Sequence, residues 1–195
     1  VEILSRVCHA LELAHARGIV HRDLKPENVM IGSFGETYLL DWGVARAFDG
    51  PDAEIGTAGT PSYMAPEMLT GRSGALGPHT DVYLLGGTLH AVLTGRPLHE
   101  GETFREVLTK AALSEPQAYP PTISADLVSL VHDATRRDPT ARLADAAAFR
   151  ARLGEVRAHR ASIALTLEVH VQLDRLEEAL SSTGDRRALL LADDT

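Results

Sequence analysis

The chain of 195 residues has the composition of a folded, acidic protein. Hydrophobic residues make up 44% and charged residues 24% of it, which is typical of globular domains and not of disordered chains. The 19 basic and 27 acidic residues give a net charge of −8, so we expect no nucleic acid among its partners. It contains no apolar run long enough to span a bilayer, so we expect no membrane segment in this chain. The single cysteine, Cys8, excludes an intramolecular disulfide and indicates a reducing compartment.

The first part of the chain predicts a helix followed by a small hairpin. Apolar residues at steps of three and four predict an amphipathic helix over residues 3–16, with Gly18 as its stop signal. Two short apolar runs, residues 29–31 and 38–40, flank a glycine-containing turn and predict a β-hairpin. The polar residues just before and after this hairpin are therefore expected to be neighbours. Because the helical pattern is already under way at Val1, we expect the sequence to begin inside a larger gene product.

The rest of the chain predicts mainly helices. Residues 44–78 are rich in glycine and proline and have no periodicity, which predicts a long loop. Residues 81–93 are apolar on nearly every face, which predicts a helix buried inside the domain. Amphipathic patterns predict further helices over residues 103–113, 125–137 and 146–157.

The pattern of the last forty residues is ambiguous. Apolar residues alternate strictly over residues 163–173, which is the period of a strand. Leu173, Leu176 and Leu180 then continue at helical spacing. We therefore interpret residues 156–195 as a helical or mixed tail that links the first domain to a following region.

Three polar motifs stand out from this background. The densest is H-R-D-L-K-P-E-N at residues 21–28, directly before the predicted hairpin. Asp41-Trp42-Gly43 follows the hairpin, and G-T-P-S-Y-M-A-P-E occupies residues 59–67. In this order the motifs resemble the catalytic loop, the D-F-G motif and the A-P-E motif of protein kinases. Asp81 and Arg142 also match family positions, the first in the central helix and the second as the partner of Glu67.

The resemblance covers residues 1–155 and implies a fold. It predicts a mainly α structure, a protein-kinase-like C-terminal lobe with a small β-hairpin beside the catalytic loop. The N-terminal lobe is missing, since no glycine-rich loop, strand lysine or helix glutamate precedes His21. We therefore expect the isolated chain to be inactive. In the full-length product we expect it in the cytoplasm or on the cytoplasmic face of a membrane protein.

The resemblance also assigns chemical roles, with ATP and Mg²⁺ as cofactors. Asp23 would orient a substrate hydroxyl and accept its proton, while Lys25 would contact the γ-phosphate. Asn28 and Asp41 offer the oxygen ligands that Mg²⁺ prefers. Met30 is interpreted either as part of the floor under adenine or as a plain core residue. Lys25, together with Thr60 before a proline, indicates a protein substrate phosphorylated on serine or threonine.

Two further groups of residues have regulatory or structural interpretations. Arg22 is typical of kinases in which a phosphate on the activation segment pairs with this arginine, and Thr57 is the predicted phosphosite. Thr60 resembles the residue that bonds instead to Asp23 and Lys25. Four residues are predicted to be structural: His21, Glu67, Asp81 and Arg142. Of these, Glu67 and Arg142 are expected to form a buried ion pair. His9 and His15 are expected on a helix surface.

Two other functions remain as alternatives. The chain could be a pseudokinase or a truncated lobe that acts as a binding module, although the catalytic residues of this lobe are all present. It could also be an aminoglycoside-type small-molecule phosphotransferase, because enzymes of that class often have Asp-Trp where this chain has Asp41-Trp42. Arg22, Lys25 and the segment 60–67 argue against the second alternative.

Overall fold

The computed structural model describes residues 1–48 and 56–192. It divides into two compact units, Val1–Gly154 and Glu155–Thr195. No helix among the described residues is both long and apolar enough to cross a membrane. Each unit is described by itself below.

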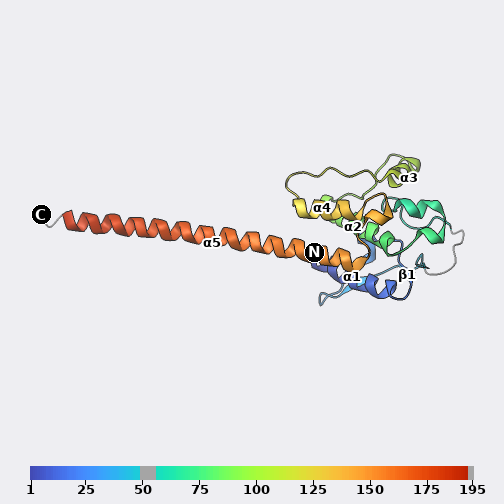
Figure 1. Ribbon diagram of the computed structural model, residues 1–195, viewed down its shortest axis with the longest axis horizontal. Coiled ribbons are helices and arrows are strands. Elements are labelled where there is room, and N and C mark those ends of the chain that lie inside the picture. The colour runs from blue at the N-terminus through green and yellow to red at the C-terminus, as the bar shows by residue number, and fades with distance from the viewer. Residues whose placement is uncertain (49–55, 193–195) are drawn as a thin grey trace. The chain divides into compact units, whose positions relative to one another are not determined.

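The first unit is built mainly from helices around one buried helix (Figure 1). This helix, α2, is in contact with α1 and α4, and Figure 1 shows it between them. Its side chains are buried on nearly every face, as the continuous apolar pattern predicts. The helices are α1 (Glu2–His15), α2 (Pro78–Thr94), α3 (Phe104–Leu113), α4 (Ala125–Ala134) and the first turns of α5 (Ala146–Ala192).

Two short antiparallel ribbons complete the first unit. β2 (Val29–Ile31) pairs with β3 (Thr37–Leu39), with Met30 opposite Tyr38. The predicted hairpin is thus present, with its second strand one residue earlier than expected. β1 (Ile19–Val20) pairs with β4 (Arg46–Ala47), a pairing that the sequence pattern did not predict.

Some helices begin or end a few residues away from their predicted boundaries. α2 begins at Pro78, three residues before the predicted start, because proline suits the first position of a helix. α4 ends at Ala134 instead of residue 137. The predicted loop 44–78 contains β4 and two short 3-10 helices, Pro66–Thr70 and Ser73–Ala75.

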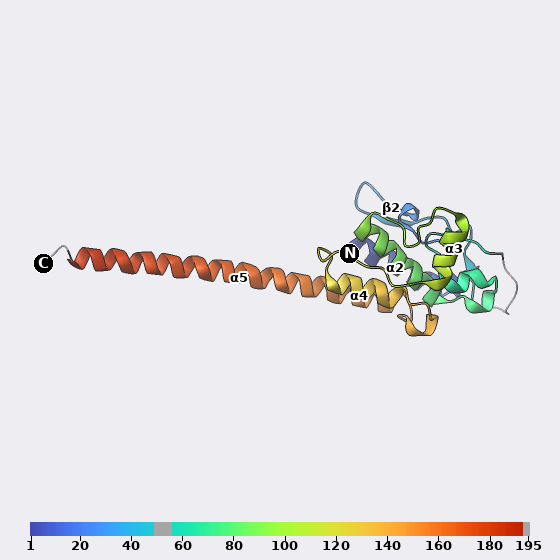
Figure 2. The ribbon, with the colours of Figure 1, turned by 90° about the horizontal axis from the view of Figure 1, so that it is seen from above.

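α2 and α4 approach each other closely at one glycine. A Cβ atom on Gly86 would lie 2.8 Å from Ala134 Cβ and from Thr135 Cγ2, closer than carbon atoms can pack. A glycine at this position therefore allows the two helices to come into contact (Figure 2).

A fully buried carboxylate on α2 holds the loop that follows β1. Asp81 accepts hydrogen bonds from the backbone N–H groups of His21 at 2.8 Å and Arg22 at 3.0 Å. His15 Nε2 lies 2.9 Å from the same carboxylate. The expectation that His15 lies on a helix surface is wrong, since its side chain is only 8% exposed. A buried carboxylate needs such partners, because its desolvation would otherwise be costly.

A buried ion pair joins distant parts of the first unit. Arg142 Nη1 and Nη2 donate to the two carboxylate oxygens of Glu67 at 2.7 and 2.8 Å. The guanidinium also donates to three backbone carbonyls and lies 4.7 Å from the centre of the Tyr83 ring. The predicted pair is therefore present, and its hydrogen-bonding groups have partners.

The second unit is helical throughout its described part, residues 155–192 of α5. Residues 163–173 are therefore not a strand, despite their strict alternation. The pattern misleads because a strand needs a partner to pair with, whereas a helix satisfies its backbone groups internally. As a result Leu165, Val169 and Leu173 are exposed on the helix.

The role of Asp81 can be tested by amide hydrogen exchange. In Asp81→Ala the N–H groups of His21 and Arg22 lose their acceptor, so we expect their exchange to accelerate by about tenfold or more. Asp133→Ala, which removes a half-buried carboxylate whose partners in the described part of the chain are Arg136 and Arg152 and not the loop, is the control and should leave both amides protected. Unchanged protection in Asp81→Ala would show that the loop does not depend on this carboxylate.

The role of the buried ion pair can be tested by urea denaturation. Arg142→Ala leaves Glu67 buried without its partner, so the free energy of unfolding should fall by about 3–5 kcal/mol. Arg96→Ala breaks an exposed pair with Glu100 and should cost less than about 1 kcal/mol. Equal losses in the two variants would contradict the structural role of Arg142.

Candidate active site

The loop between β1 and β2 folds tightly around one carboxylate, that of Asp23. The preceding residue, Arg22, has a φ of 71°, which turns the chain sharply. Pro26 begins a 3-10 turn, Pro26–Asn28, as proline's fixed φ favours. Asn28 Nδ2 then donates back to the carbonyl of Asp23 at 2.7 Å, which closes the loop.

Each oxygen of the Asp23 carboxylate has two donors. Oδ1 accepts from both the backbone N and Oγ1 of Thr60 at 2.7 Å. Oδ2 lies 3.2 Å from Lys25 Nζ and 3.2 Å from Asn28 Nδ2. The side chain is thus held in one orientation at the bottom of the loop. A positioned carboxylate of this kind can orient a hydroxyl group and act as a general base.

Thr60 connects this loop to the third sequence motif. Its hydroxyl lies 2.6 Å from Lys25 Nζ as well as 2.7 Å from Asp23. The predicted contacts of Thr60 with Asp23 and Lys25 are therefore both present. The structure brings residues 23, 25, 28 and 60 into a single hydrogen-bonded group.

Asp41 follows β3 and lies next to this group. The backbone N of Leu40 donates to the carbonyl of Asn28 at 2.8 Å, so the residues after the hairpin return to those before it. Asp41 has a φ of 58°, a conformation that aspartate tolerates better than most residues. Its carboxylate is exposed, and among the described residues Oδ1 accepts one long bond, from Gly43 N at 3.3 Å.

Asn28 and Asp41 could together hold a hard cation. The amide nitrogen of Asn28 is used within the loop, which leaves its Oδ1 oxygen available. Within residues 1–48 and 56–192 no group of three His, Cys, Asp or Glu side chains could form a metal site. This donor set fits Mg²⁺, which takes one or two protein ligands together with phosphate oxygens and water.

His21 is a packed scaffold residue with both ring nitrogens in use. Nε2 lies 2.9 Å from the carbonyl of Leu40, and Nδ1 accepts from the backbone N of Asp23 at 3.2 Å. The ring also contacts Trp42 edge to face, with centroids 4.6 Å apart. Trp42 Nε1 in turn donates to the Leu39 carbonyl at 3.0 Å, so the bulky indole is accommodated.

Met30 lies on the outer surface of the hairpin. Its side chain is 46% exposed, so its interpretation as a plain core residue is wrong. Its neighbour across the ribbon, Tyr38, is exposed to a similar degree. The interpretation of Met30 as part of an adenine floor stays a prediction.

Arg22 lies beside a pocket of about 310 Å³ that Thr57 also lines. Nη1 donates to the Val44 carbonyl at 3.3 Å, whereas Nε and Nη2 are buried without a partner among the described residues. Burial lowers the pKa of Arg22, and the nearby charge of Arg46 lowers it further. Thr57 itself is exposed. The pocket therefore combines the unused donors of Arg22 with a second positive charge, that of Arg46, which suits an anion such as a phosphate.

Sequence reasoning missed two residues of this region. Arg46 lines the same pocket as Arg22 because β4 pairs with β1. The sequence placed Arg46 in a loop and did not predict this pairing. His15 contacts Asp81 across 66 residues of sequence. The only available signal was that His15 continues the apolar face of α1, where a polar residue is expected to have a partner.

Comparison with known proteins agrees with this geometry. Residues 1–153 match the family described as the protein kinase domain. The chain is 39% identical over 160 residues to the serine/threonine-protein kinase Pkn1 of Myxococcus xanthus, covering 77% of this chain and 23% of that protein. It is 34% identical over 194 residues to PknB of Mycobacterium tuberculosis strain H37Rv, covering 95% of this chain and 30% of PknB.

The chain thus spans less than a third of the length of these relatives. The matched region contains the loop of Asp23, the residues after the hairpin and the segment that ends at Glu67. This chain therefore belongs to the protein kinase family, with bacterial serine/threonine kinases among its relatives.

Proposed function

We propose that this chain is the C-terminal lobe of a serine/threonine protein kinase. In the longer protein it would transfer the γ-phosphate of ATP to serine or threonine side chains of a protein substrate. The observation that carries the proposal is the group formed by Asp23, Lys25 and Thr60 beside Asn28 and Asp41. We place this activity in the cytoplasm, where ATP is available.

Each residue of the group has a defined task in this reaction. Asp23 accepts a hydrogen bond from the substrate hydroxyl, holds it in line and takes its proton as the new bond forms. Lys25 provides a positive charge beside the reacting oxygens. Asn28 and Asp41 hold Mg²⁺. The Mg²⁺ complex of ATP, when bound, supplies the phosphoryl group and neutralises part of its charge.

The segment 60–67 favours a protein substrate over a small molecule. Thr60 links it to Asp23, the Glu67–Arg142 pair anchors its far end, and the Ser62 carbonyl accepts from His99 N at 2.9 Å. The segment is thus held at three points next to the catalytic carboxylate. A rigid surface in this place supports binding of an extended peptide, which aminoglycoside-type phosphotransferases do not require.

The exposed apolar side chains around the hairpin are consistent with a second lobe that covers them in the longer protein. Met30, Tyr38, Leu40 and Trp42 are each between 39% and 47% exposed. Large apolar groups gathered in one region are typical of a surface that another domain covers. We accordingly propose that residues 1–195 alone lack the rest of the ATP site and are inactive.

The catalytic proposal can be tested by steady-state phosphorylation with the full-length protein. Asp23→Asn keeps the shape of the side chain but removes the proton acceptor, so kcat should fall by about 10²–10⁴-fold. The Kd for ATP should change little, because Asp23 acts on the hydroxyl and not on the nucleotide. Asp133→Asn, which changes a half-buried carboxylate on α4, is the control and should retain normal kcat.

Two results would contradict the proposal. Normal kcat in Asp23→Asn would remove Asp23 from the reaction. Phosphoryl transfer by the purified 195-residue chain would refute the requirement for a second lobe.

The predicted phosphosite can be tested by phosphopeptide mapping of the active full-length protein. We expect phosphate on Thr57, because its pocket contains the unused donors of Arg22 and the positive charge of Arg46. Thr57→Ala should lower activity, and Arg46→Gln should lower it to a similar extent because the phosphate loses a partner. Full activity in Thr57→Ala, with no phosphate found on Thr57 of the wild type, would refute this assignment.

A further inference from the structure

A buried histidine lies behind the segment 60–67, on the loop that joins α2 to α3. The backbone N of His99 donates to the Ser62 carbonyl at 2.9 Å, so this loop and the segment are in direct contact. His99 is only 2% exposed, and the reaction proposed above does not use its ring. A buried polar ring needs hydrogen-bond partners, and the identity of these partners indicates what the residue does.

The ring of His99 is part of a buried chain of hydrogen bonds. Nε2 lies 3.0 Å from the hydroxyl of Tyr83 on α2, and this hydroxyl lies 2.7 Å from Ser114 Oγ. Ser114 Oγ donates to the Thr135 carbonyl at 2.8 Å. Ser114 directly follows α3 and Thr135 directly follows α4. The chain of hydrogen bonds therefore connects the loop of His99 with three helices.

The end of α3 is strained at the point where this chain passes through it. Ser114 has a φ of 47°, a left-handed conformation that is unfavourable for residues other than glycine. Such a conformation persists only where surrounding contacts fix the residue. Here the contacts with Tyr83 and Thr135 do so. The Tyr83 hydroxyl thus fixes two parts of the chain at once, the end of α3 and the loop of His99.

The His99 ring is neutral at pH 7 and also contacts the segment 60–67. Burial lowers the pKa of His99 to about 4, although a hydrogen bond with the Met64 backbone raises it. Met64 belongs to the segment, so the ring and the backbone of His99 both contact it. An uncharged, buried ring of this kind serves to hold neighbouring groups in place and not to carry charge.

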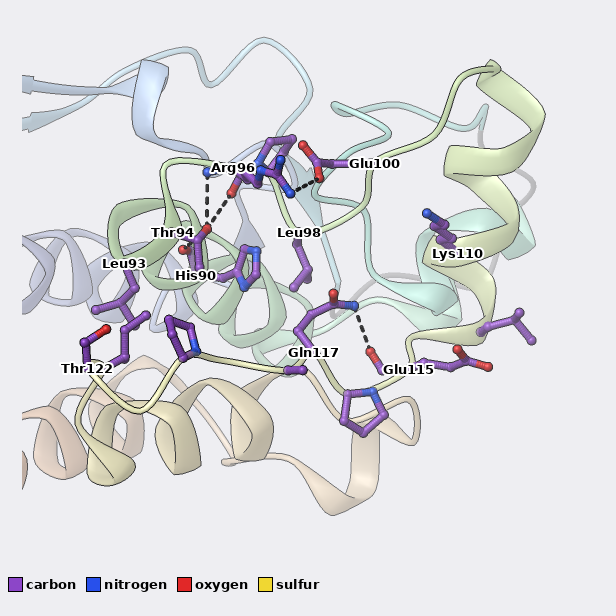
Figure 3. A pocket seen from close by; sticks show the side chains of 16 residues that line it. His90, Leu93, Thr94, Arg96, Leu98, Glu100, Lys110, Glu115, Gln117 and Thr122 are labelled. Carbon is purple, nitrogen blue, oxygen red and sulfur yellow. Dashed lines mark hydrogen bonds and ion pairs between the residues drawn. The ribbon is translucent and has the colours of Figure 1, made fainter.

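The loop of His99 borders a cavity on another side. Leu98, the preceding residue, lines a space of about 650 Å³ together with His90 and Leu93 of α2 (Figure 3). An open space provides no close contacts, so packing does not fix the loop on that side. The hydrogen bonds of His99 are therefore needed to determine where the loop lies.

We propose that His99 is a positioning residue for the protein substrate, which fixes the segment at Ser62 through its own contact with the Tyr83 hydroxyl. The inference rests on the proposed kinase function, because it assigns the segment 60–67 to the binding of the substrate peptide. A segment that is already held in place does not have to be ordered when the peptide binds, so binding is stronger.

His99 is expected to affect binding of the peptide and not the transfer step. Thr60, at the start of the segment, is held by its own hydrogen bonds to the Asp23 carboxylate. Loss of the His99 contacts therefore leaves the catalytic carboxylate with its partners. The peptide-binding part of the segment, from Ser62 onward, loses a point of attachment.

Amide hydrogen exchange on the 195-residue chain tests whether His99 holds the segment. His99→Phe keeps a ring of similar size without its hydrogen bonds, so the amides of residues 63 and 99 should exchange about tenfold faster. Tyr83→Phe removes the partner hydroxyl and should accelerate the same amides. Tyr119→Phe removes the hydroxyl from another tyrosine–histidine contact, with His90, and should leave them unchanged. Unchanged exchange in both His99→Phe and Tyr83→Phe would overturn the proposal.

Steady-state phosphorylation of dephosphorylated casein by the full-length protein separates binding from chemistry. In His99→Phe the KM for casein should rise about tenfold, whereas kcat and the KM for ATP should change less than about twofold. Tyr83→Phe should have the same effect, and the double variant should be no worse than either single one, because all of them break the same hydrogen bond. An unchanged KM for casein, a loss confined to kcat, or additive effects would each contradict the role of His99.

The two experiments distinguish this inference from the function on which it rests. Wild-type full-length protein that does not phosphorylate casein would count against the proposed function, and the exchange measurements would still decide whether His99 holds the segment. Normal phosphorylation by the wild type, with exchange and KM unaltered in His99→Phe, would retain the kinase function and refute the positioning role.

Discussion

A fully buried carboxylate is the constraint on which the rest of the structure depends. Asp81 lies on α2, a helix that is apolar on nearly every side, where a charge without partners would be strongly unfavourable. The N–H groups of His21 and Arg22, together with the ring of His15, satisfy it. Because these backbone groups must point at α2, the loop turns sharply at Arg22 and places Asp23 at its centre.

The candidate site is rigid because hydrogen bonds continue outward from Asp23 into the core. Thr60 joins the carboxylate to the segment that ends at Glu67, and Glu67 is bound by Arg142 from the far side of the unit. His21 links the loop to the residues after the hairpin, because its ring lies within hydrogen-bond distance of the Leu40 carbonyl and packs against Trp42. The Asp23 carboxylate and its partner Thr60 are therefore held by further contacts behind them, as precise chemistry requires, whereas Asp41 is exposed.

Four buried polar atoms in the described part of the chain are exceptions to this pattern of satisfied groups: Nε and Nη2 of Arg22, Nδ1 of His15 and Oγ1 of Thr37. Arg22, which carries two of these atoms, lines a pocket together with a second arginine, Arg46. Unused buried donors are costly, so the two on Arg22 are expected to serve a ligand. The positive charges of Arg22 and Arg46 favour an anion as that ligand.

The sequence alone determined the helices of residues 1–154, the hairpin and the grouping of Asp23, Lys25, Asn28 and Asp41, because local periodicity and short turns specify them. Only the tertiary structure decided that His15 pairs with Asp81 and that β4 brings Arg46 to the Arg22 pocket. It also decided that residues 163–173 are helical and that His90 faces a cavity. These features depend on whether segments far apart in the chain come into contact. The spacing of residues within one segment does not contain that information.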